Sequence, residues 1–163
     1  MKNLLFLLSI LFTSIHADSF KKGSIGVNIA AGSASLNTNE DTKNYTVIGA
    51  GADYFFADDI SLGLEYTYWS GNTPNISQLT VPLNYYIPFS KKVLPYLGTF
   101  YRYTSMGEPY SDYSSYGVKA GITVNISKNT FLGAGWIEEY YKECSNFKEC
   151  STGYPELLIL FTF

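Results

Sequence analysis

The ionisable residues that are best placed to bind an ion or take part in a reaction lie in stretches where apolar and small residues alternate. Three are carboxylates, Asp53, Glu65 and Glu156, and two are cations, Arg102 and Lys119. Opposite charges in a confined space can form a charged constriction for ions, or they can pair and fill the space. Because neighbouring cations repel unless carboxylates lie between them, these residues are expected to form one interior charge cluster. Ion pairing is the favoured interpretation, and a narrow charged pore is the alternative.

Nucleophilic catalysis is poorly supported by the composition. The one histidine, His16, falls in a segment that is expected to be removed, and serine is a weak nucleophile without a base. The "GAGAD" at 49–53 lacks the lysine and the helix of a phosphate loop. The "NTNEDTKN" at 37–44 lacks the ordered oxygen ligands of a calcium loop. We therefore expect no enzyme activity, no metal and no other cofactor.

Two cysteines, Cys144 and Cys150, lie in "KECSNFKEC" near the end of the chain. In an exported chain, an even and close pair favours a disulfide over two free thiols. The bond would close a short ring and restrict the open states of the loop. The stapled loop would either resist proteolysis or display an epitope, with Phe147 at its tip, to a host cell, a phage or a neighbouring protein.

The elements that must position these residues follow a predicted secretory signal peptide at residues 1–17. Lys2 precedes an apolar core from Leu4 to Phe12, which is too short to span a membrane, and a polar, small-residue run ends at Ala17. Residues 18–163 are then expected to form one domain. The net charge of -3 is too small and too dispersed to favour nucleic acid as a partner.

After residue 17 the dominant pattern is alternation with a period of two, interrupted by clusters of Gly, Asn, Asp, Ser and Pro. Eight runs show it, at 23–36, 45–56, 60–69, 76–88, 94–104, 115–126, 130–141 and 154–163. No later run reaches the ~18 to 20 apolar residues of a membrane-spanning helix. Each run is longer than the usual strand of a globular protein and long enough to cross a bilayer at a tilt.

The connections between these runs alternate in length. They are short at 57–59, 89–93 and 127–129, intermediate at 70–75, and long at 37–44, 106–114 and 142–153. Short turns on one side and longer loops on the other are typical of an outer-membrane barrel. We therefore predict an all-β fold, an eight-stranded antiparallel up-and-down transmembrane β-barrel.

The alternation also predicts which residues face the lumen. In the third run Leu62 and Leu64 share one face, and Ser61 and Glu65 share the other. If the polar face is the interior, the other inward polar residues are Asn28, Asp53, Thr80, Asn84, Arg102, Lys119, Thr123, Asn125 and Glu156. Glycines that played no part in choosing the phase also fall inside, namely Gly49, Gly51, Gly63, Gly98, Gly117 and Gly121. A soluble barrel of the lipocalin kind would have the inverse order of faces.

The seventh run, "TFLGAGWIEEYY", alternates poorly. Aligning it on the third run places Leu132, Ala134 and Trp136 outside and Gly133 and Gly135 inside. Glu138 and Glu139 are then expected near the outer rim, where a charge facing either way costs little.

Aromatic residues are arranged by height along the runs, which predicts two girdles at the levels of the lipid headgroups. The girdle at the long-loop ends comprises Tyr66, Tyr68, Trp69, Tyr101, Tyr103, Tyr116, Trp136, Tyr140, Tyr141 and Tyr154. The girdle at the short-turn ends comprises Phe56, Phe89, Phe131, Phe161 and Phe163.

The signal sequence, the eight amphipathic runs and the terminal "LLILFTF" together resemble the small eight-stranded outer-membrane β-barrels of the OmpA/OmpX type. In that group a C-terminal Phe after alternating apolar residues is recognised by the barrel-assembly machinery. The resemblance therefore implies an assembly signal at Phe161 and Phe163. Leu158 and Leu160 depart from the common pattern because these inward residues are apolar too.

The resemblance implies a monomer in the outer membrane of a Gram-negative cell, in contact with lipid and lipopolysaccharide. The expected function is structural, in envelope integrity, or an adhesin-like surface interaction with a host or cell-surface ligand at the long loops. The alternative is a small pore or an OmpW-like channel for ions or small apolar solutes. Pro82 and Pro88 favour a lateral opening because proline has no ladder donor.

Overall fold

The computed structural model describes residues 20–37, 42–90, 92–107, 111–142 and 150–163. The predicted signal peptide lies outside these ranges and stays a prediction. The strands are β1 (Ile25–Asn37), β2 (Thr42–Ala57), β3 (Ile60–Ser70), β4 (Ile76–Tyr86), β5 (Val93–Ser105), β6 (Tyr113–Ser127), β7 (Thr130–Tyr141) and β8 (Ser151–Thr162). Within the described residues, no helix is long and apolar enough to cross a membrane.

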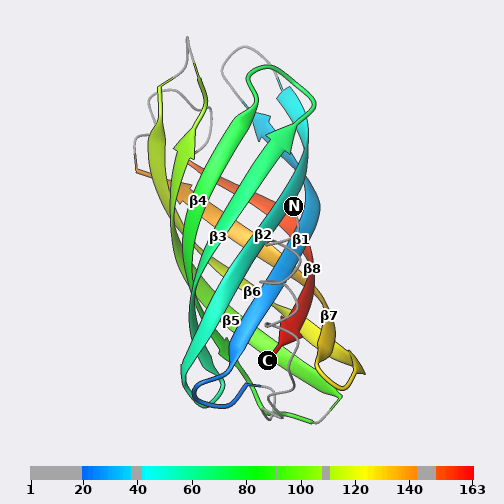
Figure 1. Cartoon of the computed structure of the whole chain (residues 1–163). Coiled ribbons are helices and arrows are strands. Elements are labelled where there is room, and N and C mark those ends of the chain that lie inside the picture. Colours follow the sequence, from blue (N-terminus) through cyan, green and yellow to red (C-terminus); the bar gives the residue numbers. More distant parts are fainter. Residues whose placement is uncertain (1–19, 38–41, 91, 108–110, 143–149) are drawn as a thin grey trace, which may run out of the picture.

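The strands form a closed antiparallel barrel in sequence order, in which β8 pairs back onto β1 (Figure 1). This confirms the predicted fold class. β7 has the predicted bounds, and the other strands differ from the prediction by at most three residues at either end. β2 begins early because its first residue, Thr42, still pairs with Asn37 of β1.

The tight turns lie at one end of the barrel and the longest connections at the other (Figure 1). Only Asp58 and Asp59 separate β2 from β3, and Asp59 takes a positive φ of 62°, which Asp tolerates better than most residues. The connection between β4 and β5 is longer than predicted. β4 ends at Tyr86, before Pro88, which therefore lies in the turn and not in the strand.

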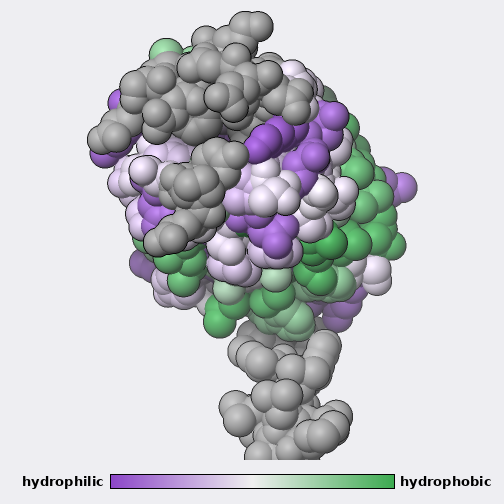
Figure 2. Space-filling model, turned by 90° about the horizontal axis from the view of Figure 1, so that it is seen from above, coloured by the Kyte–Doolittle hydropathy of each residue, from purple (hydrophilic) through white to green (hydrophobic). Residues whose placement is uncertain are grey.

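Alternate residues of each strand face outward and into the lumen, as predicted. In β3, Leu62 and Leu64 are 49% and 54% exposed, whereas Ser61 and Glu65 are 0% and 6% exposed. Such an outward apolar surface is unfavourable in water and favourable in the hydrocarbon core of a bilayer. Seen from the long-loop end, hydrophilic side chains gather over the end of the barrel and hydrophobic ones border its outside (Figure 2).

Inward glycines make room for the large side chains that fill the lumen. Tyr96 of β5 pairs in register with Gly121 of β6, which pairs in turn with Gly135 of β7. A Cβ atom on Gly121 would lie 2.7 Å from the Tyr96 ring, too close for a real contact. Gly117 has the same relation to Phe100. The predicted inward phase of the glycines is thus confirmed.

The aromatic residues are divided between the lipid side and the lumen. The outward position predicted at the long-loop end is confirmed for Tyr66, Tyr68, Tyr101, Tyr103, Tyr116, Trp136 and Tyr140. The prediction is wrong for Trp69, Tyr141 and Tyr154, and for Phe131 at the short-turn end, all of which are buried in the lumen. Height along the strand was the only criterion for the girdles, whereas these four residues occupy inward positions of the alternation.

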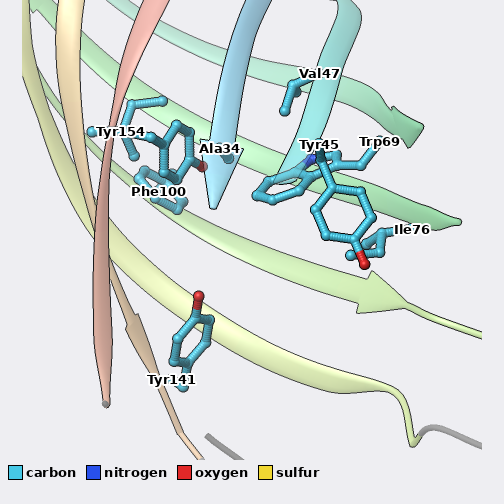
Figure 3. Packing of buried hydrophobic residues seen from close by; sticks show 9 residues of the cluster. Ala34, Tyr45, Val47, Trp69, Ile76, Phe100, Tyr141 and Tyr154 are labelled. Atoms are coloured by element: carbon cyan, nitrogen blue, oxygen red, sulfur yellow. The ribbon is translucent and has the colours of Figure 1, made fainter. Parts of the chain in front are cut away.

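The buried apolar side chains form two cores, one toward each end of the lumen. The long-loop core consists of Ala34, Tyr45, Val47, Trp69, Ile76, Phe100, Ile137, Tyr141 and Tyr154. Within it, the ring centroid of Trp69 lies 5.8 Å from that of Tyr45 and 5.7 Å from that of Tyr154 (Figure 3). The short-turn core consists of Phe20, Phe55, Tyr86, Leu94, Tyr96, Phe131, Leu158 and Leu160.

Phe20 precedes the first strand and yet is only 2% exposed. Its ring centroid lies 4.5 Å from that of Tyr86 and 4.7 Å from that of Phe131. The Asp59 N–H donates to its carbonyl at 2.7 Å. Phe20 therefore belongs to the aromatic packing at the short-turn end of the lumen.

The segment after Phe20 is held on the outside by Asp58. The Lys22 N–H donates to Asp58 Oδ1 at 2.9 Å, and Lys21 Nζ lies 3.4 Å from Asp58 Oδ2. The hydrogen bond from Lys22 holds the pKa of the exposed Asp58 carboxyl below its usual value. The β2–β3 turn thus holds the segment just before β1 against the barrel.

Backbone pairing is interrupted near two prolines. The β1–β8 register covers six pairs and ends at Ala31↔Leu157, whereas β1 and β2 pair over thirteen. The pairing stops two residues before Pro155, which has no N–H to donate. Between β3 and β4 the register skips Val81 and Pro82 and continues on both sides of them.

Candidate functional site

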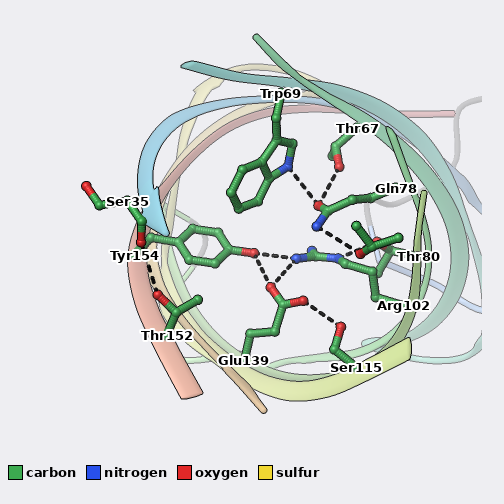
Figure 4. Close-up of polar contacts among 11 residues, drawn as sticks. Ser35, Thr67, Trp69, Gln78, Thr80, Arg102, Ser115, Glu139, Thr152 and Tyr154 are labelled. Atoms are coloured by element: carbon green, nitrogen blue, oxygen red, sulfur yellow. Dashed lines mark hydrogen bonds and ion pairs between the residues drawn. The ribbon is translucent and has the colours of Figure 1, made fainter. Parts of the chain in front are cut away.

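The predicted charge cluster is divided into separate groups, and the largest contains Arg102. Its Nη1 lies 2.7 Å from Oε2 of Glu139, in an ion pair whose side chains are 5% and 1% exposed. Arg102 also donates from Nε to Thr80 Oγ1 at 2.8 Å and from Nη1 to the hydroxyl of Tyr154. The guanidinium lies over the Phe100 ring, 4.6 Å from its centroid. Side chains of β4, β5, β7 and β8 thus hold one cation inside the barrel (Figure 4).

Glu139 lies two residues before the long-loop end of β7 but is buried in the lumen in an ion pair, so the expectation that its charge costs little in either direction is wrong. Its Oε2 accepts from the Tyr154 hydroxyl at 3.0 Å, and its Oε1 accepts from the Ser115 hydroxyl at 2.5 Å. β7 keeps its alternation beyond Gly135, which turns Glu139 inward and Glu138 outward. The sequence signal that identifies Glu139 is therefore the inward phase of Gly135, continued by four residues.

A second polar group, centred on Gln78, lies next to Arg102 in the lumen (Figure 4). Gln78 Oε1 accepts from Trp69 Nε1 at 2.8 Å and from Thr67 Oγ1 at 3.0 Å. Gln78 Nε2 donates to Thr104 Oγ1 at 3.2 Å. The indole N–H of Trp69 needs a partner when it is buried, and Gln78 supplies it. Neither residue was among the predicted site residues.

Lys119 and Glu156 form the third group. Lys119 Nζ lies 3.7 Å from Glu156 Oε1, and the Tyr96 hydroxyl donates to Glu156 Oε2 at 2.9 Å. The register of β5 to β8 aligns Tyr96, Gly121, Gly135 and Glu156 in one row. The Tyr96 ring therefore lies over the two glycines, which have no side chains, and its hydroxyl reaches the Glu156 carboxylate. Lys119 is thus the ion-pair partner of Glu156, whereas the ion-pair partner of Arg102 is Glu139.

Asp53 is 2% exposed and makes no ion pair within the described part of the chain. Asn28 Nδ2 donates to it at 2.8 Å, and Asn84 Nδ2 is at 3.4 Å. Buried carboxylates need such partners because an uncompensated charge is costly in a low-dielectric interior. The partners of the Asp53 carboxylate are thus asparagine amides, whereas the sequence predicted a cation beside it.

Glu65 is 6% exposed and, among the described residues, its carboxylate takes part in no hydrogen bond or ion pair. It lines a cavity of ≈ 20 Å³ together with Thr67, Gln78, Arg102, Glu156 and residues of β1. That volume holds about one water molecule. Two more of the five predicted cluster residues, Arg102 and Glu156, line the same cavity, so Glu65 lies near both charges without a direct ion pair.

The charged groups of the lumen are held by ion pairs and hydrogen bonds. Within the described ranges, no group of three or more His, Cys, Asp or Glu side chains is placed to hold a metal ion. The carboxylates of Glu139 and Glu156 accept hydrogen bonds from hydroxyls. These contacts stabilise a filled lumen.

Two further predicted sites lie near the end of the chain. Cys150 is disulfide-bonded, and Cys144 lies outside the described residues, so their pairing stays a prediction.

The Ile25 N–H donates to the Phe163 carbonyl at 3.0 Å, and the Phe163 N–H donates to the Ile25 carbonyl at 2.9 Å. Phe161 and Phe163 are partly exposed at the β1–β8 seam, and their role as an assembly signal stays a prediction.

Comparisons with solved structures place this barrel among small outer-membrane proteins. The N-terminal β-barrel domain of Pseudomonas aeruginosa OprF superposes with a TM-score of 0.66 at 14% identity, over 87% of this chain and 98% of that one. Neisserial surface protein A gives a TM-score of 0.66 at 17% identity, over 87% and 100%. Ail, the attachment invasion locus protein of Yersinia pestis, gives 0.53 at 14% identity, over 87% and 99%.

Sequence comparison assigns the chain to a family. No curated protein matches the chain. The family model described as "Outer membrane protein beta-barrel domain" matches residues 4–151, which is most of the sequence. With the closed eight-stranded barrel and its outward apolar face, this match shows that the chain belongs to the outer membrane protein beta-barrel domain family and is a protein of the outer membrane.

Proposed function

We propose that the protein is a closed, non-conducting barrel that anchors a ligand-binding surface in the outer membrane. The observation that carries this proposal is the network across the lumen, in which Arg102, Glu139 and Tyr154 contact one another (Figure 4). A conducting pore needs a continuous water path, whereas these side chains meet at hydrogen-bond distance across the lumen, toward its long-loop end.

Opening the lumen would require this network to separate. Breaking a buried ion pair by removing one partner typically costs about 3 to 5 kcal/mol, and Arg102 and Glu139 are each almost fully buried. The aromatic residues of the two cores would also have to move, since rings such as Tyr96 and Phe100 fill the space above inward glycines. The closed state is therefore the one that the side chains favour.

The long-loop end carries the features of a presented surface. Asp112, in the β5–β6 connection, accepts from the Tyr103 hydroxyl at 2.6 Å and from the Met106 N–H at 3.2 Å. The hydrogen bond from Tyr103 holds the pKa of Asp112 below its usual value, so this anchor persists at neutral pH. The names of two proteins with similar barrels, a surface protein and an attachment invasion locus protein, support a role in surface interaction.

Conductance of the refolded protein in a planar bilayer tests closure. We expect no steps for the wild-type protein and discrete steps for the double variant Arg102→Ala, Glu139→Ala, which removes the central ion pair. Glu138→Ala is the matched control, because Glu138 is the next residue of β7 and faces outward. Steady conductance by the wild-type protein would contradict a closed barrel.

Binding to host cells or to purified surface glycans tests the presented surface. Replacing residues 106–112 and 142–150 by short Gly and Ser linkers removes the two longest connections and leaves the strands intact. We expect the folded variant to lose binding, whereas replacing the β6–β7 turn at 128–129, at the other end, should leave binding unchanged. Equal binding by both variants would contradict the proposal.

A lateral channel is the second candidate function, and one observation favours it. The β3–β4 register skips Pro82, so the wall lacks ladder hydrogen bonds there. Uptake of a small apolar solute into liposomes tests this route. The variant Pro82→Val should restore the ladder and abolish uptake if the solute passes at this position, and unchanged uptake would exclude it.

A further inference from the structure

We propose that two turns at the short-turn end of the barrel bind the headgroup of an anionic phospholipid in the periplasmic leaflet. The surface consists of Phe89 and Lys92 at the β4–β5 turn and of Ile126 and Lys128 at the β6–β7 turn, and we name it the basic turn surface. It lies at the end of the barrel opposite the long connections (Figure 1), so it is separate from the proposed ligand-binding surface.

The two lysines of the basic turn surface have no partner in the described part of the chain. Lys92 and Lys128 are exposed, and the side chain of neither takes part in an ion pair or a hydrogen bond there. The other described cations lie beside a partner group, namely Lys21 and Lys22 beside Asp58, Lys43 beside the Thr73 carbonyl, Arg102 beside Glu139, Lys119 beside Glu156 and Lys142 over the Tyr101 ring. Two exposed ammonium groups without a carboxylate favour an anion from outside the chain.

Backbone contacts hold the two turns next to each other. The Asn125 N–H donates to the Lys92 carbonyl at 2.8 Å, and the chain reaches Lys128 just after Asn125, as β6 ends. The acidic side chains described at this end of the barrel, Asp58 and Asp59, lie in the β2–β3 turn instead. The positive charge of Lys92 and Lys128 is therefore concentrated on one side of the rim.

The apolar half of the surface favours a lipid over a soluble anion. Phe89 is 79% exposed, more than any other large apolar side chain of the described residues, and Ile126 is 59% exposed. Ile126 continues the lipid-facing row of β6 beyond Val124. A phospholipid places its phosphate beside the two lysines and its acyl chains along Phe89 and Ile126. A free phosphate or a carboxylate covers only the charged half.

The position of the turns determines which headgroups they meet. Short turns of outer-membrane barrels face the periplasm, so this rim lies at the headgroups of the inner leaflet. A lysine near an anionic membrane surface contributes about fivefold in affinity, and two lysines about 25-fold. The attraction decays within about 8 Å at physiological ionic strength, so added salt should weaken the preference for an anionic headgroup.

NMR of the refolded protein in lipid nanodiscs tests the basic turn surface. Phosphatidylcholine is replaced stepwise by phosphatidylglycerol at constant total lipid and low salt. We expect the Asn125 and Phe89 amide signals of the wild-type protein to shift and to saturate, and salt to reverse the shift. The double variant Lys92→Gln, Lys128→Gln should need a many-fold higher fraction of phosphatidylglycerol. Lys142→Gln, which removes an exposed cation at the other end, is the matched control and should respond as wild type.

A second comparison separates a lipid from other anions. Phe89→Ser should weaken the response to phosphatidylglycerol, and inorganic phosphate added to phosphatidylcholine discs should leave the wild-type signals unchanged. Three results would overturn the proposal. They are an equal lipid response of the double variant and the wild type, an equal response to inorganic phosphate, and sedimentation with purified peptidoglycan that needs both lysines while phosphatidylglycerol has no effect.

Discussion

Arg102 and Glu139 meet inside the barrel with 2.7 Å between Nη1 and Oε2, and both side chains are almost fully buried. They belong to β5 and β7, which share no hydrogen-bonded ladder because β6 lies between them. The ion pair therefore links strands that the backbone leaves unlinked. Tyr154 extends the link to β8 by contacting both partners.

Arg102→Ala should lower the free energy of unfolding by about 3 to 5 kcal/mol, because it leaves the Glu139 carboxylate buried without its cation. Urea unfolding of the refolded protein measures this loss. Lys128→Ala, in the β6–β7 turn, removes an exposed cation and should change stability by less than about 0.5 kcal/mol. An unchanged unfolding midpoint and unchanged heat-modifiable migration of Arg102→Ala would contradict the role assigned to the pair.

Combining Arg102→Met with Glu139→Leu should cost less than the two single variants added together. Each single change leaves one uncompensated charge, whereas the double change leaves none. We expect a coupling free energy of about 2 to 3 kcal/mol from a double-mutant cycle on urea unfolding. Arg102→Met with Glu138→Leu is the control cycle, because Glu138 faces outward, and its coupling should be close to zero.

The sequence predicted the barrel well because period-two alternation is a local property. It placed Glu65 and Lys119 inside, and it explained the inward glycines, from the residues of single strands. It did not place Glu139 in the lumen, because Glu138 and Glu139 are adjacent and the alternation alone does not show which of them faces inward. It placed Trp69 on the outside because position along the strand was the only criterion for the aromatic girdles. The sequence did not predict which charged residues pair in the lumen. Arg102 meets Glu139 only because of the combined register of β5, β6 and β7, which single strands do not reveal.

Gly121→Ala should lower stability by about 1 to 3 kcal/mol, because the added methyl group would clash with the Ala134 carbonyl oxygen and Gly135 Cα of β7 and with the Tyr96 ring. The ring would then move away from Glu156 and weaken that hydrogen bond. Urea unfolding measures the effect, and ultraviolet circular dichroism of the aromatic bands reports the ring. Ala120→Leu, one residue earlier and facing outward, is the control. Equal stability of the two variants would contradict tight packing over the glycines.

The segment that follows Phe20 should lose its anchor only in strong acid. The Lys22 N–H stabilises the ionised form of Asp58, so the carboxyl pKa in the folded protein lies below its usual 3.8. A lowered pKa adds stability that is present above 3.8 and disappears as the pH falls through the folded value. NMR titration of the Lys22 amide should show this midpoint, and Asp58→Asn should abolish it. A midpoint at or above 3.8 would contradict the contact.

Phe163→Ala should slow insertion of the protein more than it lowers the stability of the inserted barrel. The backbone of Phe163 exchanges two hydrogen bonds with Ile25, and alanine can form both, so closure of β8 onto β1 is retained. The ring is only partly buried, which limits its contribution to packing. A recognition signal for the assembly machinery, by contrast, depends on the ring itself.

Insertion into proteoliposomes with and without that machinery separates the two roles. We expect the defect with the machinery present, and Phe161→Ala should add to it. An equal defect in both kinds of liposome would assign Phe163 to stability alone.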